Sequence, residues 1–166
     1  GGAAIGHVRY STTGGSHLKN TQPFAVQYAG GAVAVAHNGN LVNAEALRAE
    51  LEAAGSIFSA STDTEVIVHL IARAKAGGAP GSTEQLLSAV REALGRVVGA
   101  YSILFLTPKG LIGARDPMGF RPLVLGRMKG GDWVLASETT ALDLIEAEYV
   151  REIEPGEVIF IDQDGP

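Results

Sequence analysis

The sequence contains no cysteine, and this absence removes several kinds of chemistry from the 166-residue chain. Disulfide bonds, thiolate metal ligands and thiol nucleophiles are all excluded within it. Basic residues are also scarce, because 13 Lys and Arg are outnumbered by 18 Asp and Glu, giving a net charge of -5. A chain with this balance lacks the positive surface that binds a phosphate backbone, so we expect no nucleic-acid partner.

Long apolar runs are missing as well. No stretch approaches the roughly 20 apolar residues that a membrane-spanning helix needs, and the first residues lack the basic and apolar regions of a secretory signal. We therefore expect no membrane partner and a cytoplasmic location. The chain starts at Gly1 rather than Met and enters an apolar stretch at residues 4–8, which we predict to be a short buried strand. We interpret the chain as a segment of a longer protein.

The composition and the order of apolar patterns indicate one globular α+β domain. Hydrophobic residues make up 46% and charged residues 19% of a chain long enough to bury a sizeable core. Strand-like runs come first, helical patterns follow, and strand-like runs return, which does not match the regular alternation of a doubly wound parallel sheet. An α+β layered fold with largely antiparallel sheets is predicted. The predicted strands are 24–28, 32–36, 100–107, 111–114, 123–126, 133–136 and 158–161, and the predicted helices are 44–54, 63–77, 83–94 and 139–146.

Two helix starts carry capping signals. Asn43 is predicted to cap the first helix through its side chain. Thr62 and Glu65 fit a capping box, in which Thr62 caps the second helix and Glu65 bonds back to it.

The apolar run at residues 31–39 leads into His37, Asn38 and Gly39. The Asn38 side chain and the unobstructed N–H of Gly39 are adjacent donors that could hold a developing oxyanion. The alternative is a plain strand followed by an Asn-Gly turn, because both residues tolerate positive φ. On these residues alone the turn is favoured, and His37 is then interpreted as a residue that orients the loop.

Two charged residues could recognise an amino acid. Arg9 can bind a carboxylate through two parallel hydrogen bonds, and Thr12 and Thr13 follow it in a loop rich in hydroxyl groups. Asp63 could pair with an ammonium group, although an acidic residue in a first helical turn also stabilises the helix by itself. If both bind, the site recognises the two charges of an α-amino acid.

A second dense cluster lies at residues 115–122. Asp116 is predicted to pair with Arg115 or Arg121 in a salt-bridged turn that shapes the site without taking part in catalysis. The four histidines show no paired ligand spacing, so we expect no metal site.

Together, the motifs resemble the glutaminase domain of the amidophosphoribosyltransferase family, a class II glutamine amidotransferase. The segments that carry the resemblance are, in order, GHVRYSTTGGS, NTQPF, AHNGNLVN, STDTEV, GAYS, ARDPMGFRPLVLG, ASET and EIEPGEV. The resemblance implies a four-layer αββα sandwich of the N-terminal-nucleophile hydrolase type, incomplete at its N-terminus. Residues 1–166 would form a partial class II glutaminase domain.

This resemblance implies a glutamine site with a partner for each charge of the substrate. Arg9, helped by Thr12 and Thr13, would hold the α-carboxylate, and Asp63 would bind the α-ammonium. The pair at residues 38–39 would form the oxyanion hole.

The resemblance also implies a reaction. The parent enzyme would hydrolyse glutamine through an N-terminal cysteine and pass ammonia to phosphoribosylpyrophosphate in purine synthesis, so this cysteine-free segment alone is expected to be inactive. Its partners would be glutamine and the absent phosphoribosyltransferase domain, in a homo-oligomer. We expect no cofactor in the segment, Mg²⁺ in the transferase domain and, as an open alternative, an iron–sulfur cluster in the parent. A glutamine-sensing module without catalysis, and the glutaminase domain of another class II enzyme such as glucosamine-6-phosphate synthase, stay open as alternatives.

Overall fold

The computed structural model describes residues 2–8 and 20–166 of the chain. Residues 2–8 form no strand, and Val8 is 90% exposed. The predicted buried strand at residues 4–8 is therefore wrong. A strand is defined by hydrogen bonds to a neighbouring strand, and this segment joins neither sheet of the described structure.

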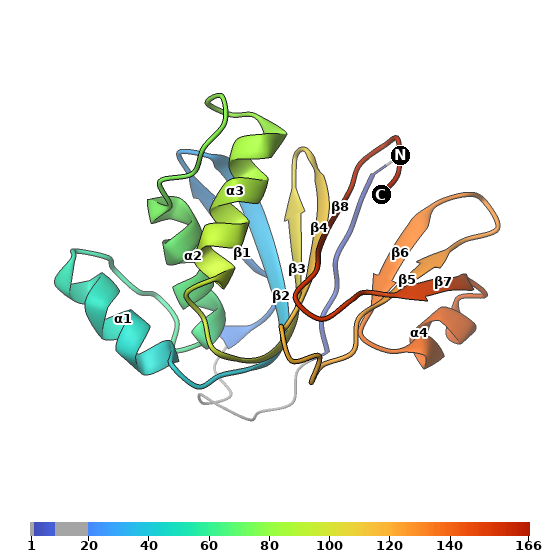
Figure 1. Cartoon of the computed structure of the whole chain (residues 1–166), viewed down its shortest axis with the longest axis horizontal. Helices are drawn as coiled ribbons and strands as arrows, with labels where there is room; N and C mark the ends of the chain where they lie inside the picture. The colour runs from blue at the N-terminus through green and yellow to red at the C-terminus, as the bar shows by residue number, and fades with distance from the viewer. Residues whose placement is uncertain (1, 9–19) are drawn as a thin grey trace.

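The larger of two sheets has five antiparallel strands in the order β1-β2-β3-β4-β8. Its strands are β1 (Phe24–Tyr28), β2 (Gly31–Leu41), β3 (Gly99–Thr107), β4 (Gly110–Arg115) and β8 (Val158–Ile161). One face of this sheet is covered by helices, seen on the left in Figure 1. These are α1 (Ala44–Ala53), α2 (Asp63–Arg73) and α3 (Thr83–Leu94), of which α2 packs on β1 and β2. The core between the layers includes Ile67, Ile103 and Phe105, all fully buried.

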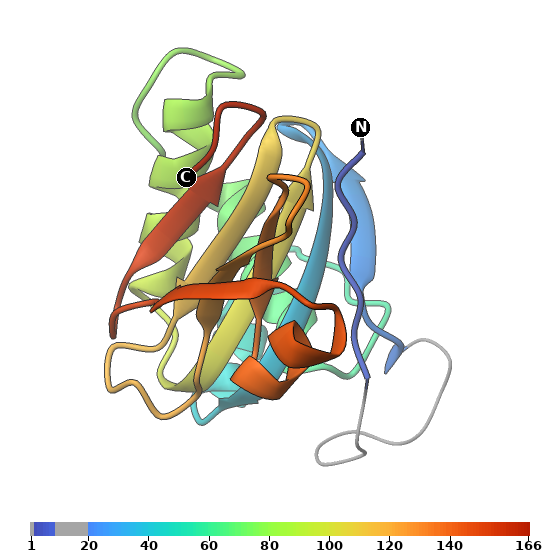
Figure 2. The same cartoon turned by 90° about the vertical axis from the view of Figure 1, so that its right-hand side faces the viewer.

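The smaller sheet packs on the other face of the larger one. Its antiparallel strands, in the order β6-β5-β7, are β6 (Trp133–Ala136), β5 (Val124–Arg127) and β7 (Glu148–Glu152). A second core that includes Leu123, Leu135 and Ile159 lies between the two sheets. The helix α4 (Thr139–Leu144) contacts β6 and β7, and lies in front of the sheets in Figure 2. The result is the predicted sandwich of helices, sheet, sheet and helix.

Most predicted elements are confirmed to within a few residues, and one was missed. β7 reads EYVRE and is largely exposed, so it offers neither an apolar run nor a clear alternation. It forms a strand because β5 supplies its hydrogen-bonding partner. Helix α2 ends at Arg73, earlier than predicted.

Neither predicted side-chain cap forms: the Thr62 hydroxyl has no hydrogen-bond partner among the described residues, and the Asn43 and Glu65 side chains bond to loops. Asn43 Oδ1 accepts from the Val98 N–H at 2.9 Å, and its Nδ2 donates to the Arg96 carbonyl at 2.9 Å. Glu65 accepts from the N–H and hydroxyl of Ser59, at 2.8 and 2.9 Å, and from the Ala60 N–H at 2.7 Å. The Ala60 N–H is buried and needs an acceptor, which Glu65 provides. Among the described residues, no helix is long and apolar enough to cross a membrane.

The close approach of the two sheets depends on Gly113 in β4. A Cβ at this position would lie 2.6 Å from Leu135 Cδ1 and 3.1 Å from Ile159 Cγ2. We expect Gly113→Val to lower the free energy of unfolding by about 1–3 kcal/mol, as overpacking typically does. Gly77→Val is the matched control, because nothing lies within 4 Å of a Cβ there. Urea unfolding measures both, and equal stabilities would contradict the tight inter-sheet contact.

Candidate functional site

His37, Asn38 and Gly39 lie inside β2 and not in a turn. They pair with Ile103, Ser102 and Tyr101 of β3 without a break in register. The Asn-Gly turn favoured by the local sequence is therefore wrong, because β3 supplies a partner for every residue of β2 from Ala34 to Leu41. Gly39 has φ +151°, and a Cβ there would lie 2.0 Å from the Ala100 carbonyl oxygen.

The N–H groups at residues 37, 39 and 41 point to the same edge of β2, because N–H directions alternate along a strand. β1 covers this edge only as far as the Phe24–Val35 pair. Beyond that pair, the His37 N–H donates to Gln22 Oε1 at 2.6 Å, and the Leu41 N–H donates to Asp63 Oδ2 at 3.1 Å. The Gly39 N–H lies between these two bonded groups, and no side chain among residues 20–166 accepts from it.

The Asp63 carboxylate lies at the start of α2, against this edge. Its Oδ1 is 3.3 Å from His37 Nδ1, and its side chain keeps 16% exposure, whereas the His37 side chain keeps 1%. Burial would raise the pKa of Asp63, but the hydrogen bond and charge of His37 and the N–H groups of Leu41 and Thr64 outweigh it, so the pKa is lowered. Asp63 is therefore an ionised carboxylate held against β2 at His37 and Leu41, the residues on either side of the segment that contains Gly39.

The Asn38 side chain lies on the other face of the sheet from His37, because successive side chains in a strand alternate. His37 belongs to the helix-covered face, and Asn38 lies opposite Ser102 on the face toward the smaller sheet. Asn38 and Gly39 are both half-buried. The two predicted oxyanion donors thus belong to neighbouring residues of one strand. The Asn38 side chain projects from one face of the sheet, whereas the Gly39 N–H lies in the plane of the sheet.

Two residues that we did not predict for the site, Asn20 and Gln22, lie along this edge. Asn20 is 1% exposed. Its Nδ2 donates to Ser61 Oγ at 3.1 Å, and its Oδ1 accepts from the Ser61 N–H at 3.1 Å and from the Ser61 hydroxyl at 3.3 Å. Gln22 reaches the His37 N–H. Both belong to the NTQPF motif, and their place in that motif was the only available signal.

Three buried polar atoms around Asp63 have no hydrogen-bond partner among the described residues. They are His37 Nε2 and the hydroxyls of Thr62 and Thr64. An unsatisfied buried group costs about 1–3 kcal/mol, and such groups call for an explanation in a folded protein. Their position next to an ionised carboxylate is typical of a functional site.

The predicted carboxylate-binding residues Arg9, Thr12 and Thr13 lie outside the described residues. Within the described ranges, Asp63 contacts His37 and Leu41, the residues that flank the segment 38–40 in β2.

The turn at residues 115–121 differs from its prediction, because Asp116 pairs with neither arginine. Four backbone N–H groups bond to its fully buried carboxylate instead: those of Tyr101 at 3.3 Å, Met118 at 3.1 Å, Phe120 at 3.0 Å and Arg121 at 2.9 Å. Burial would raise the pKa of Asp116, but these N–H groups outweigh it, so the pKa is lowered.

Arg115 is held in the same way, mainly by backbone groups. Its guanidinium donates to the carbonyls of Arg121 at 2.8 Å, Ile153 at 2.7 Å and Gly119 at 3.0 Å, and forms an ion pair with Glu152 at 3.0 Å. Arg121 takes part in these contacts through its backbone N–H and carbonyl, and the residue is exposed. Because the Asp116 N–H donates to the carbonyl of Tyr101, which lies opposite Gly39, this turn fixes β3 beside the site.

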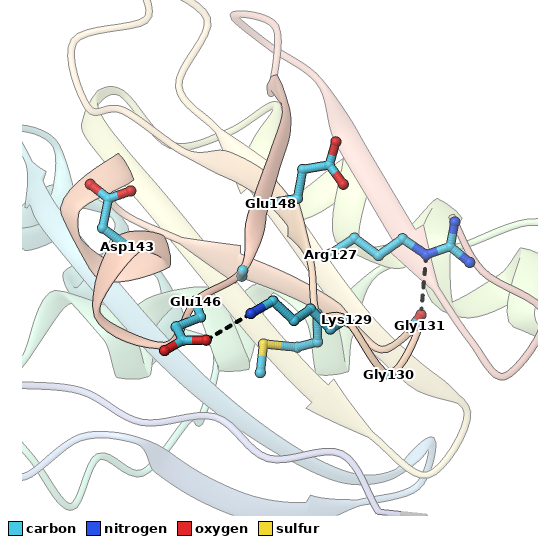
Figure 3. Close-up of a pocket in the computed structure, with 9 residues that line it drawn as sticks. Arg127, Lys129, Gly130, Gly131, Asp143, Glu146 and Glu148 are labelled. Atoms are coloured by element: carbon cyan, nitrogen blue, oxygen red, sulfur yellow. Dashed lines mark hydrogen bonds and ion pairs between the residues drawn. The ribbon is translucent and has the colours of Figure 1, made fainter.

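A separate hollow of about 680 Å³ lies on the smaller sheet, between the β5–β6 turn and the α4–β7 connection (Figure 3). Its charged groups contact one another: Lys129 Nζ is 2.8 Å from Glu146 Oε2, and Arg127 Nε donates to the Gly131 carbonyl at 3.4 Å. It is lined by none of the residues predicted for the site. No group of three His, Asp or Glu able to hold a metal ion occurs in residues 2–8 and 20–166.

The sequence matches a protein family described as a glutamine amidotransferase domain over residues 7–144. The chain is 56% identical over 165 residues to amidophosphoribosyltransferase 2, chloroplastic, of Arabidopsis thaliana. It is 48% identical over 162 residues to amidophosphoribosyltransferase of Staphylococcus aureus strain Mu50. These alignments cover 99% and 98% of the chain but only 28% and 31% of the relatives, so the chain spans less than a third of their length.

Solved structures give the same picture. Glutamine phosphoribosylpyrophosphate amidotransferase from B. subtilis, complexed with ADP and GMP, matches with a TM-score of 0.84 and 42% identity, over 96% of this chain and 32% of that one. A structure titled as the allosteric regulatory enzyme of purine biosynthesis matches with a TM-score of 0.86 and 45% identity, over 96% of this chain and 33% of that one. These likenesses confirm the α+β fold of the N-terminal-nucleophile hydrolase type.

Removing the Asp116 carboxylate should destabilise the protein. Asp116→Ala leaves four backbone N–H groups without their acceptor, and we expect the free energy of unfolding to fall by about 3 kcal/mol or more. Asp143→Ala, at an exposed position of α4, is the matched control and should change little. Thermal and urea unfolding measure both variants. A loss below about 1 kcal/mol would contradict a structural role for this carboxylate.

Stability should also fall in acid. The pKa values of Asp63 and Asp116 are lowered in the folded protein, so the unfolded chain binds protons first as the pH falls. Their contribution is complete above the ordinary carboxyl pKa of 3.8 and is lost as the pH falls through the folded values. Urea unfolding between pH 7 and pH 2 should show this decline, with a shallower slope in Asp63→Asn. An unchanged slope in that variant would show that Asp63 is not coupled to folding.

Proposed function

Because the chain belongs to the glutamine amidotransferase domain family, we propose that residues 1–166 form part of a class II glutaminase domain that binds glutamine. The observation that carries this proposal is the ionised Asp63 held at the edge of β2 by the Leu41 N–H, two residues from the Gly39 N–H on the same edge. A carboxylate and a backbone donor at one point of a sheet edge suit a ligand with an ammonium group and a carbonyl oxygen.

In this proposal, each polar group of glutamine has a partner in the chain. Asp63 binds the α-ammonium, and Arg9 with Thr12 and Thr13 binds the α-carboxylate. The side-chain amide carbonyl is directed to residues 38–39. His37 contacts Asp63 and keeps its carboxylate oriented toward the edge of β2.

The proposed reaction is amide hydrolysis with a cysteine nucleophile that lies outside these 166 residues, since they contain no cysteine. The thiolate attacks the amide carbon, and the negative charge that develops on the carbonyl oxygen is stabilised by the Asn38 side chain and the Gly39 N–H. The proton that the thiol has lost is transferred to the amide nitrogen, which leaves as ammonia, and water then hydrolyses the thioester to glutamate and the free thiol. Both donors act on charge that is present only in the transition state and the intermediate, so they raise the rate of the chemical step.

We propose further that the complete protein transfers this ammonia to phosphoribosylpyrophosphate, giving 5-phosphoribosylamine and pyrophosphate. The support is the high identity to amidophosphoribosyltransferases and the match to a phosphoribosylpyrophosphate amidotransferase. The remaining two thirds of the relatives' length would supply the phosphoribosyltransferase domain, any Mg²⁺ and the homo-oligomer contacts. A cytoplasmic location stays a prediction, and the names of several relatives place those proteins in chloroplasts.

The roles of Asp63 and Asn38 separate kinetically in the complete protein. Asp63→Asn removes a partner of the bound substrate, so we expect the KM for glutamine to rise about tenfold or more, consistent with the loss of a charge-assisted bond. Asn38→Ala removes an oxyanion donor, so kcat should fall by roughly 10²–10³ with a smaller change in KM.

The control is the same synthesis with ammonia supplied directly. Each variant should retain this ammonia-dependent activity, because the chemistry after glutamine hydrolysis does not involve these residues. Glutamine kinetics that match wild type in both variants would overturn the proposed site.

A further inference from the structure

We propose that Gln22 is a positioning residue of this site, which holds the edge of β2 so that the Gly39 N–H stays aimed at the substrate oxygen. The inference rests on the proposed function for its catalytic consequence, and its structural part can be tested separately. Gln22 itself bonds to the backbone of β2.

The side chain of Gln22 accepts a hydrogen bond from β2 at a point where the backbone of β1 no longer pairs with it. The β1–β2 pairing ends at Phe24 and Val35, and the next residue toward the N-terminus is Pro23. Gln22 stands where the next partner of His37 would be, and its side-chain oxygen accepts the His37 N–H at 2.6 Å. β2 is thereby fixed for two residues beyond the end of β1.

A second bond anchors the segment that carries Gln22. Asn20, 1% exposed, bonds to Ser61 in both directions, and Ser61 lies two residues before Asp63. Glu65 in turn fixes the preceding loop through Ser59 and Ala60. Residues 20–22 therefore connect the start of α2 to β2. Asp63 makes a second connection between α2 and β2 through the Leu41 N–H, so these contacts form a closed ring.

The Gly39 N–H lies at the centre of this ring. Its neighbours on the edge, the N–H groups of His37 and Leu41, are both bonded to side chains, one to Gln22 and one to Asp63. Two fixed points on either side hold the intervening peptide in place. Because misplacing a catalytic group by about 1 Å can cost about 10²-fold in rate, this constraint matters for an oxyanion donor.

Three variants test whether the Gln22 side chain holds the edge of β2 in place. Gln22→Met keeps the length of the side chain but removes the acceptor, whereas Gln22→Glu keeps an acceptor oxygen. Gln27→Met makes the first substitution at an exposed position of β1 and serves as the matched control.

The first measurement is amide hydrogen exchange of the 166-residue chain by NMR. In Gln22→Met, the His37 amide should exchange at least about threefold faster than in wild type, as the loss of one hydrogen bond predicts. Gln22→Glu and Gln27→Met should exchange like wild type at this amide. If the His37 amide of Gln22→Met exchanges at the wild-type rate, Gln22 does not hold the edge of β2, whatever ligand the protein binds.

The second measurement is glutamine hydrolysis by the complete protein. Gln22→Met should lower kcat about ten- to a hundredfold with the KM for glutamine within about threefold, and Gln22→Glu should restore most of the loss. A rise in KM alone, or no rescue by Gln22→Glu, would overturn the positioning role. If wild type itself hydrolyses no glutamine, the proposed function fails, and the exchange data still decide whether Gln22 holds the strand.

Discussion

The candidate site depends on the contact between the Asp63 carboxylate and the edge of β2. Asp63 begins α2, and its oxygens meet the Leu41 N–H and His37 Nδ1, so one side chain joins the helical layer to the larger sheet. Partial burial alone would favour the neutral acid, and only these donors keep it ionised. A carboxylate that is charged, oriented and still 16% exposed is suited to bind a cation.

A second buried carboxylate supports the neighbouring strand. Asp116 takes four backbone N–H groups, and its own N–H donates to the carbonyl of Tyr101, which pairs with Gly39. Asp116 therefore uses backbone donors in place of an arginine partner, and Asp63 uses them in addition to His37. Backbone groups hold fixed directions, so they fix a loop more firmly than an ion pair between two long side chains. β2, which contains the Gly39 peptide, and the neighbouring β3 are both held in this way.

The predictions that came closest were those where the local pattern agrees with its surroundings. β1, β6 and β8 match their apolar runs, and α3 begins where Ser82 caps it, with the Ser82 hydroxyl accepting from the Gln85 N–H at 3.0 Å. Where the local sequence pattern and the tertiary surroundings favour different structures, the tertiary surroundings determine which one forms. β7 is a strand with little apolar signal because β5 pairs with it, and Glu65 gives up a capping role because a buried loop needs its oxygens.

The sequence by itself determined the fold class, the limits of most elements and the residue types needed to bind an amino acid, because these follow from hydrophobic periodicity, turn residues and side-chain chemistry. Only the tertiary structure decided that residues 38–39 lie in a strand and not in a turn. It also decided that Asp63 and Gln22 bond to the N–H groups on either side of Gly39. The physical reason is that hydrogen-bond partners of a strand come from segments distant in sequence, here residues 20–22, 63 and 99–106, whose approach no local pattern encodes.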